Sequence, residues 1–296
     1  MATTQSSDKF QLVTDKLIQL LENGVKPWVK DWTYSGESAP RNMASGHVYT
    51  GINPILCNID CLLLKDPRPY FIGFSQLKDF NWLLKKGSKS TWIFWGGTGK
   101  AEKENPDTGE IESHFYNAQK WHNVFHCSLI DDSKSDVKVS DFIKRYEAET
   151  IANPDPKIDE IEEFLKATGA NINHGGNQAY YTSSHDYIQL PKFEQFSSAT
   201  GYYATALHEL THWTGHKTRC DRKLGNRFGS PDYAYEELIA ELGAAYLCND
   251  FSIHNEIENH ASYLAGWLKA LKNDKKFFFK AATQAKKAYL FLKPDK

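Results

Sequence analysis

Residues 197–216 read SSATGYYATALHELTHWTGH, and this stretch decides the fold of the C-terminal half. Either serine at its start can cap a helix, and apolar residues then recur at helical spacing. Residues four apart lie on one face of a helix, so His208 and His212 can bind one metal ion. Glu209 stands beside them, where it can take a proton from a water that the ion activates. The stretch therefore predicts a metal site with Glu209 as general base.

A third protein ligand has to come from elsewhere in the chain. The metzincin pattern fails, because Thr218 stands where that pattern has its last histidine. The helical run YAYEELIAELGAAYL at 233–247 offers three acids instead. By analogy with gluzincin-type sites, Glu237 is the expected ligand and Glu241 the acid that holds a ligand histidine. Glu241 and Glu236 are each expected to take such a holding role or to serve as an alternative ligand. Zinc is the expected ion, although Mn or Co can occupy such a site.

Composition places the whole chain among folded proteins. It has 296 residues, 41% of them hydrophobic, and a net charge of -2, which excludes a mostly disordered chain and a protein that coats nucleic acid by bulk charge. Five cysteines without a Cys-x-x-Cys pair fit reduced thiols. No signal peptide or membrane-spanning run is recognisable, so we expect a cytoplasmic protein without a membrane partner.

Charge and tryptophan content divide the chain into two parts. Residues 1–130 contain six of the eight tryptophans and a surplus of four basic residues once 100–112 are set aside. The acidic stretch 99–112 reads as an exposed loop between strands. Polar residues and the NPDP break predict a linker over 131–157, and 158–296 form the second domain. Both parts mix helices and strands, so the predicted class is α+β with two domains.

Hydrophobic periodicity places the main elements. In the first domain it predicts helices from about residue 8 to 23, from 53 onward and from 75 to 87, and strands over 91–95 and 120–130. In the second it predicts a helix over 158–169, strands near 170–173 and 179–191, and further helices. These cover about 197–216, 232–250, 255–273 and 275–292.

Basic and aromatic residues alternate in the first domain. Such interleaving fits a surface on which bases of single-stranded DNA stack while cations contact phosphates. Buried tryptophans and solvated lysines would give the same pattern, and the residues alone leave both interpretations open. The candidate DNA-binding residues are Lys26, Trp28, Lys30, Trp32, Tyr34, Arg41, Asn42, Lys85, Lys86 and Lys89.

Five segments resemble ArdC-type antirestriction proteins of plasmids. They are LVTDKLIQLLENGVKPWVKDW (12–32), PRNMASGHVYTGINPILC (40–57), KKGSKSTWIFW (85–95), HELTHWTGH (208–216) and EELIAELGAAYL (236–247). The resemblance implies an N-terminal single-stranded-DNA-binding domain followed by a zincin-like metallopeptidase domain. It also implies metal ligation by His208 and His212, a general base at Glu209 and acids within 236–241.

Three functions follow as alternatives. The first is an antirestriction protein that binds single-stranded DNA, protects incoming plasmid DNA and has a host restriction protein or another protein as partner. The second is a cytosolic zinc metallopeptidase of the gluzincin-like type with a protein substrate. The third is a DNA-binding protein whose metal serves only its structure.

Overall fold

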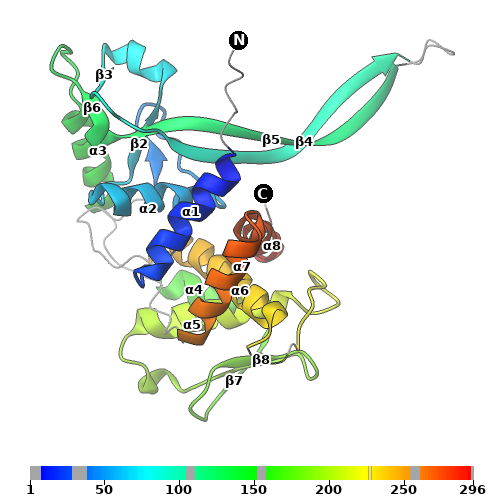
Figure 1. The fold of residues 1–296 in the computed structure, drawn as a ribbon. Helices are drawn as coiled ribbons and strands as arrows, with labels where there is room; N and C mark the ends of the chain where they lie inside the picture. The colour runs from blue at the N-terminus through cyan, green and yellow to red at the C-terminus, as the bar shows by residue number, and fades with distance from the viewer. Residues whose placement is uncertain are drawn as a thin grey trace.

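The computed structural model describes residues 8–28, 39–104, 111–151, 158–225, 227, 229–253 and 261–294. It has the predicted α+β architecture in two parts (Figure 1). Among the described residues, no helix combines the length and apolar character needed to cross a bilayer.

The N-terminal part is built around a four-stranded sheet with the order β1-β2-β5-β4. Strand β1 runs parallel to β2, and the other pairs are antiparallel. Helix α1 begins after Asp8, whose side chain accepts the backbone N–H of Phe10. The elements in chain order are α1 (Lys9–Glu22), β1 (Arg41–Asn42), α2 (Asn53–Leu64), β2 (Tyr70–Gly73), η1 (Ser75–Phe80), β3 (Leu83–Leu84), β4 (Thr91–Glu104), β5 (Ile111–His126), η2 (Cys127–Leu129), β6 (Ile130–Asp131) and α3 (Val139–Ile151).

Strands β4 and β5 form a long two-stranded ribbon. They pair residue for residue from Thr91 opposite Val124 to Glu104 opposite Ile111. The far half of the ribbon extends beyond the rest of the molecule (Figure 1). The prediction of a loop over 99–112 is therefore wrong outside 105–110, which lie outside the described residues. Polar residues do not end a strand whose backbone groups are paired across the ribbon, and Lys100 and Glu102 form an exposed ion pair on it.

The C-terminal part is mainly helical, with a small sheet of order β7-β9-β8. The helices predicted there from periodicity are present, although the one predicted over 255–273 is described only from Ala261 onward. The strand near 170–173 is also present, but the single strand predicted over 179–191 is two strands, 180–182 and 187–190, joined by a turn. The elements are α4 (Ile158–Ala167), β7 (Asn171–His174), β8 (Tyr180–Thr182), β9 (Tyr187–Leu190), η3 (Phe193–Gln195), α5 (Ala199–Thr214), α6 (Pro231–Asp250), α7 (Ala261–Asn273) and α8 (Phe277–Leu292).

Two predictions near the middle of the chain are wrong. The helix predicted from 75 to 87 is a short 3-10 helix, η1, because Leu83 and Leu84 instead pair with β6. The linker predicted over 131–157 contains α3, which buries Val139, Ile143 and Tyr146 against the N-terminal sheet. Residues spaced three or four apart share a helix face, and here that face belongs to the first domain's core.

The two parts share one hydrophobic core. Helix α1 lies between the N-terminal sheet and the C-terminal helices, and packs against α7 (Figure 1). Its fully buried Leu17 belongs to the same cluster as Ile59 of α2, Trp267 of α7 and Phe278 of α8. The predicted domains are therefore in extensive apolar contact, which fixes how the first sits on the second.

Candidate metal centre

Helix α5 presents the two predicted histidines side by side. Ser198 caps the helix by accepting the backbone N–H of Gly201 at 3.0 Å. The imidazole rings of His208 and His212 lie 4.8 Å apart between centroids and nearly perpendicular. Most of α5 is buried, so its position and the direction of both rings are fixed by core packing.

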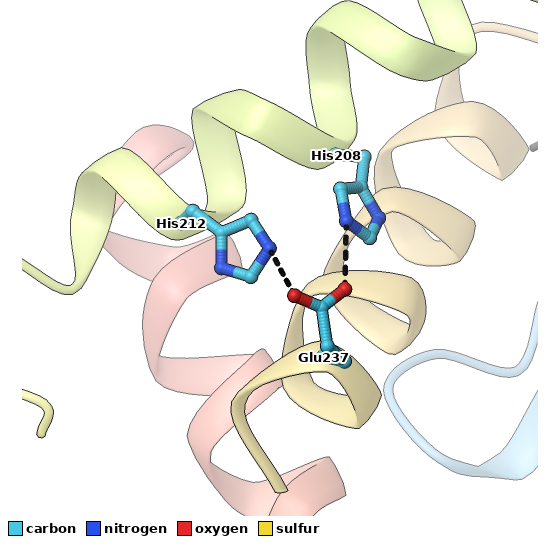
Figure 2. Close-up of side chains that lie close together, drawn as sticks. All are labelled: His208, His212 and Glu237. Carbon is cyan, nitrogen blue, oxygen red and sulfur yellow. Dashed lines mark ion pairs between the residues drawn. The ribbon is translucent and has the colours of Figure 1, made fainter. Parts of the chain in front are cut away.

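Helix α6 brings one carboxylate between the two imidazoles. Glu237 Oε2 lies 3.6 Å from His208 Nε2, and Glu237 Oε1 lies 3.6 Å from His212 Nε2 (Figure 2). The three ligand atoms lie within 4.8 Å of one another. Metal–ligand bonds of about 2.1 Å in a tetrahedral arrangement put neighbouring ligand atoms about 3.4 Å apart. Two imidazoles and one carboxylate at these separations therefore fit a divalent ion.

Burial and the neighbouring carboxylates act in opposite directions on the two imidazoles. Burial disfavours a charged imidazole, but the Glu237 carboxylate outweighs it and raises the pKa of His208. The pKa of His212 is raised further, because Glu236 is a second acid beside it. The same imidazoles lower the pKa of Glu237 against the effect of burial. A bound cation would take the place of these protons.

Glu236 and Arg222 hold the His212 ring through Nδ1, the nitrogen that does not face Glu237. Glu236 Oε1 accepts from His212 Nδ1 at 3.1 Å, which leaves Nε2 of His212 directed at Glu237. Arg222 donates to both oxygens of Glu236, at 2.9 and 2.8 Å, and to the backbone oxygen of Thr211 at 2.7 Å. Sequence reasoning gave Glu241 and Glu236 either such a holding role or that of an alternative ligand, and it missed Arg222; in this structure Glu236 holds His212.

Glu209 is buried at the wall of the site. Its residue surface is 7% exposed, and burial raises its pKa although His208 and His212 and the backbone N–H of Tyr181 act in the opposite direction. A carboxyl whose pKa is raised holds a proton more readily than an ordinary one, which suits it to accept and return a proton. The arrangement is compatible with the general base predicted at this position.

Glu241 lies one turn beyond Glu237 and faces the same cavity. Its residue surface is 2% exposed, and burial raises its pKa. Oε2 of Glu241 and Nδ1 of His208 are both buried and have no hydrogen-bond partner within the described part of the chain. Unlike the acid behind His212, Glu241 therefore makes no hydrogen bond to its histidine in this structure.

A cavity of about 980 Å³ opens over the site. The edge strand β8 forms one wall, and two tyrosines, Tyr233 and Tyr263, form another, with their hydroxyls 3.0 Å apart. Arg219 fixes the β8–β9 turn on the end of α5, because it pairs with Asp186, donates to Tyr181 Oη and stacks 3.8 Å from the Trp213 ring. The cavity is thus bounded by the edge strand of the small sheet, next to the candidate ligands.

The predicted DNA-binding residues are only partly on the surface. Trp28 is 5% exposed and packs against Trp267 and Phe278, so no ring face is left for a base, and the prediction that it stacks on DNA is wrong. Arg41 lies over the Tyr146 ring, and Asn42 donates to Gln76.

Other candidates keep an accessible charge. Lys85, Lys86 and Lys89 are exposed near the start of β4, and Lys26 is partly exposed. Lys85 also donates to the backbone oxygen of Ser128. Lys30, Trp32 and Tyr34 lie outside the described residues.

Sequence reasoning missed an exposed aromatic and cation pair on the ribbon. Trp95 is 49% exposed and lies directly opposite Lys120, which is also exposed. The neighbouring Phe94 and Trp121 point to the other face, where they contact Phe10 and Phe279. Alternation along β4 was the available signal, because Trp95 and Phe94 must face opposite sides.

Two family descriptions divide the chain near the predicted boundary. Residues 7–125 match the N-terminal domain of the anti-restriction factor ArdC, and residues 159–284 match a zincin-like metallopeptidase domain.

Solved structures match almost the whole chain. The metal-free antirestriction protein ArdC of plasmid R388 is 35% identical, with 97% of each chain covered and a TM-score of 0.71. Its Mn(II)-bound structure is 33% identical with the same coverage and TM-score.

Two curated relatives differ in length. The protein y4eC of Sinorhizobium fredii is 32% identical over 94% of this chain and 89% of its own. The DNA primase TraC of Escherichia coli is 33% identical over 95% of this chain, and that match spans 26% of TraC. With both domains matched in order and the R388 protein aligned end to end, the chain belongs to the ArdC family of antirestriction proteins.

Proposed function

We propose that this protein binds single-stranded DNA and protects incoming plasmid DNA from restriction, with a divalent metal, zinc or manganese, in its C-terminal domain. The end-to-end similarity to the R388 antirestriction protein carries this proposal. On this proposal the protein acts in the cytoplasm of the receiving cell, where entering DNA meets restriction enzymes.

The exposed part of the N-terminal domain offers the chemistry that a single strand needs. Trp95 supplies a ring face, and Lys120 lies beside it in register on the ribbon. Lys85, Lys86 and Lys89 add positive charge near the start of the same ribbon. Base stacking on an aromatic ring contributes about 1–3 kcal/mol, and lysines contribute through phosphate contacts that weaken as salt rises.

Binding can be tested with a labelled single-stranded oligonucleotide and fluorescence anisotropy over a series of salt concentrations. We expect Trp95→Ala to weaken binding at every salt concentration and Lys120→Ala to reduce the salt dependence. Phe291→Ala is the matched control, because Phe291 is an aromatic residue of similar exposure, 46%, on α8. Salt-independent or absent binding by the wild type would refute the DNA proposal.

Peptide hydrolysis is a second candidate function, favoured by one observation. Glu209 is buried near His208 and Glu237 in a cavity that is also lined by β8, the edge strand of the small sheet. Held by His208, His212 and Glu237, a divalent ion supplies a Lewis acid that lowers the pKa of water. Glu209 accepts the proton of the attacking water and returns it to the leaving amine, while β8 can pair with an extended substrate chain.

One experiment separates protection from hydrolysis. Plasmid transfer into a restricting recipient is compared between wild type and Glu209→Ala, with metal content measured on both proteins. If transfer stays protected when Glu209 is absent, DNA binding explains the function and the metal serves the structure. If protection is lost while metal and DNA binding are retained, hydrolysis of a host restriction protein or another protein substrate is required.

A further inference from the structure

Trp28 follows α1 by six residues, and its side chain packs into the C-terminal domain. The Trp28 ring lies 5.6 Å from the Trp267 ring and 6.0 Å from the Phe278 ring, between centroids. Trp267 in turn donates its indole N–H to the backbone oxygen of Ala234 at 2.8 Å, so α7 is anchored to the first turn of α6. Trp28 is thereby held against the helix that carries Glu237 and Glu241.

Three buried polar atoms remain without a hydrogen bond around one side of the metal centre. They are Trp28 Nε1, Glu241 Oε2 and His208 Nδ1, and the described residues offer no partner at bonding distance to any of them. Buried donors and acceptors nearly always form a hydrogen bond, because a buried group without one has lost its hydrogen bonds to water and gained nothing in return. Two of the three are donor and acceptor partners by chemistry, an indole N–H and a carboxylate oxygen.

The electrostatics show that these groups are neighbours. Burial is the largest influence on the pKa of Glu241 and raises it. The charges of His208 and Lys26, and hydrogen bonding from Trp28, act in the opposite direction. Trp28, His208 and Lys26 thus all act on the Glu241 carboxylate, while the indole N–H and Oε2 of Glu241 are both left without a hydrogen bond.

Each of the two candidate ligand histidines has an acid associated with it, but the residues that act on the two acids come from different domains. On one side, His212 donates to Glu236, and Glu236 is held by Arg222. On the other side, the Glu241 carboxylate is influenced by the charge of His208 and by Trp28 and Lys26 of the N-terminal part. The first support comes from within the metal-binding domain, and the second crosses to the other domain.

We propose that Trp28 is a positioning residue for the metal centre. Its indole N–H directs the Glu241 carboxylate at Nδ1 of His208, so that Nε2 of His208 faces the ion. The proposal rests on metal binding by His208, His212 and Glu237. It adds that the N-terminal domain supplies part of the centre, although none of its described residues is among the proposed ligands.

The test uses the full-length protein loaded with Co(II), whose visible spectrum reports the geometry of its ligands. Trp28→Phe keeps an aromatic ring in the core and removes only the N–H. We expect it to lower the affinity for Zn(II), measured by competition with a chelator, by about tenfold, and to alter the Co(II) spectrum. Glu241→Gln should lower the affinity similarly, and the double variant should lose less than the sum of the two losses.

Phe278→Leu is the matched control, because the Phe278 side chain stacks on the Trp28 ring and carries no polar group. We expect it to lower the melting temperature and leave affinity and spectrum unchanged. An unchanged affinity and spectrum in Trp28→Phe overturns the proposal, as does an equal loss in Phe278→Leu. Should Trp28→Phe fail to fold, wild-type affinity in Glu241→Gln overturns it. Absence of metal binding by the wild type would instead refute the metal site itself.

Discussion

The metal centre and the proposed DNA-binding surface stand on different scaffolds. The ligands come from two long helices, α5 and α6, which are capped by Ser198 and Ser230 and packed in the core. Trp95 and Lys120 come from a two-stranded ribbon whose far half extends beyond the rest of the molecule (Figure 1). On a helix, spacing in the sequence fixes which side chains share a face. On a ribbon, alternation gives the face, but only the covering elements decide which face is exposed.

Removal of both ligand histidines should have the largest effect. We expect His208→Ala/His212→Ala to lower bound metal from near one ion per chain to background, because one carboxylate cannot hold the ion alone. Elemental analysis of the purified protein measures this. His185→Ala is the control, since His185 is exposed on the β8–β9 turn. Wild-type metal content in the double variant would place the site elsewhere.

The two tryptophans sharpen the comparison between core and surface. Trp28→Ala should lower the free energy of unfolding by about 3–5 kcal/mol, because it leaves a cavity in the shared core. Trp95→Ala should change it by less than about 0.5 kcal/mol, because half of that side chain already faces solvent. Urea denaturation measures both. Equal effects of the two substitutions would contradict the placement of Trp28 in the core.

The support behind His212 is the next test. We expect Arg222→Met to lower metal affinity by about 10–100-fold, since it leaves the buried Glu236 carboxylate without its cation and free to turn away from His212. Competition with a chelator gives the affinity. Lys223→Met is the control, because the neighbouring Lys223 side chain is 76% exposed. An affinity equal to that of the wild type would show that Glu236 needs no cation to hold the imidazole.

Competition between protons and the metal ion for His208 and His212 should have the smallest and most gradual effect on metal affinity. The carboxylates raise the pKa of His208 and His212 in the metal-free protein, so protons occupy the ligand atoms above the ordinary imidazole range near pH 6.5. Metal affinity should therefore rise with pH through that raised range. Conversely, the stability that these charged imidazoles give the metal-free protein is present below their unfolded pKa and lost as pH rises.

Calorimetric titration with Zn(II) at several pH values, in buffers of different ionisation enthalpy, measures the protons released on binding. Parallel urea denaturation of the chelated protein checks the opposite trend in stability. A pH-independent affinity across this range would show that the imidazoles are already neutral before the metal binds.

The candidate metal ligands could be predicted from the sequence, but not all of the residues that hold them in place could be. His208 and His212 follow from helical spacing, Glu237 was chosen by analogy with gluzincin-type sites, and the structure brings the three together. Arg222 lies in the irregular stretch between α5 and α6, where no periodicity indicates which way a side chain points. The choice between Glu236 and Glu241 depended on how α6 is rotated and where it crosses α5, which packing decides.

In the N-terminal domain the main elements were predictable, but exposure was not. The same composition, aromatic and basic, describes Trp28 in the core and Trp95 on the ribbon. What distinguishes them is contact with α7 and α8, more than two hundred residues along the chain from Trp28. The folded helix α3 within the predicted linker was missed for a similar reason, because its apolar face is short and its partner is the N-terminal sheet.

The core shared by α1, α2, α6, α7 and α8 has a consequence for how this unit can be inherited. Either domain produced alone would expose the apolar face that the other covers, including Leu17 and Trp267, and would be prone to aggregate. Recombination that separates the two domains is therefore expected to give unstable products, whereas transfer of both domains together is not. The match of 95% of this chain within the much longer TraC is what such indivisibility predicts.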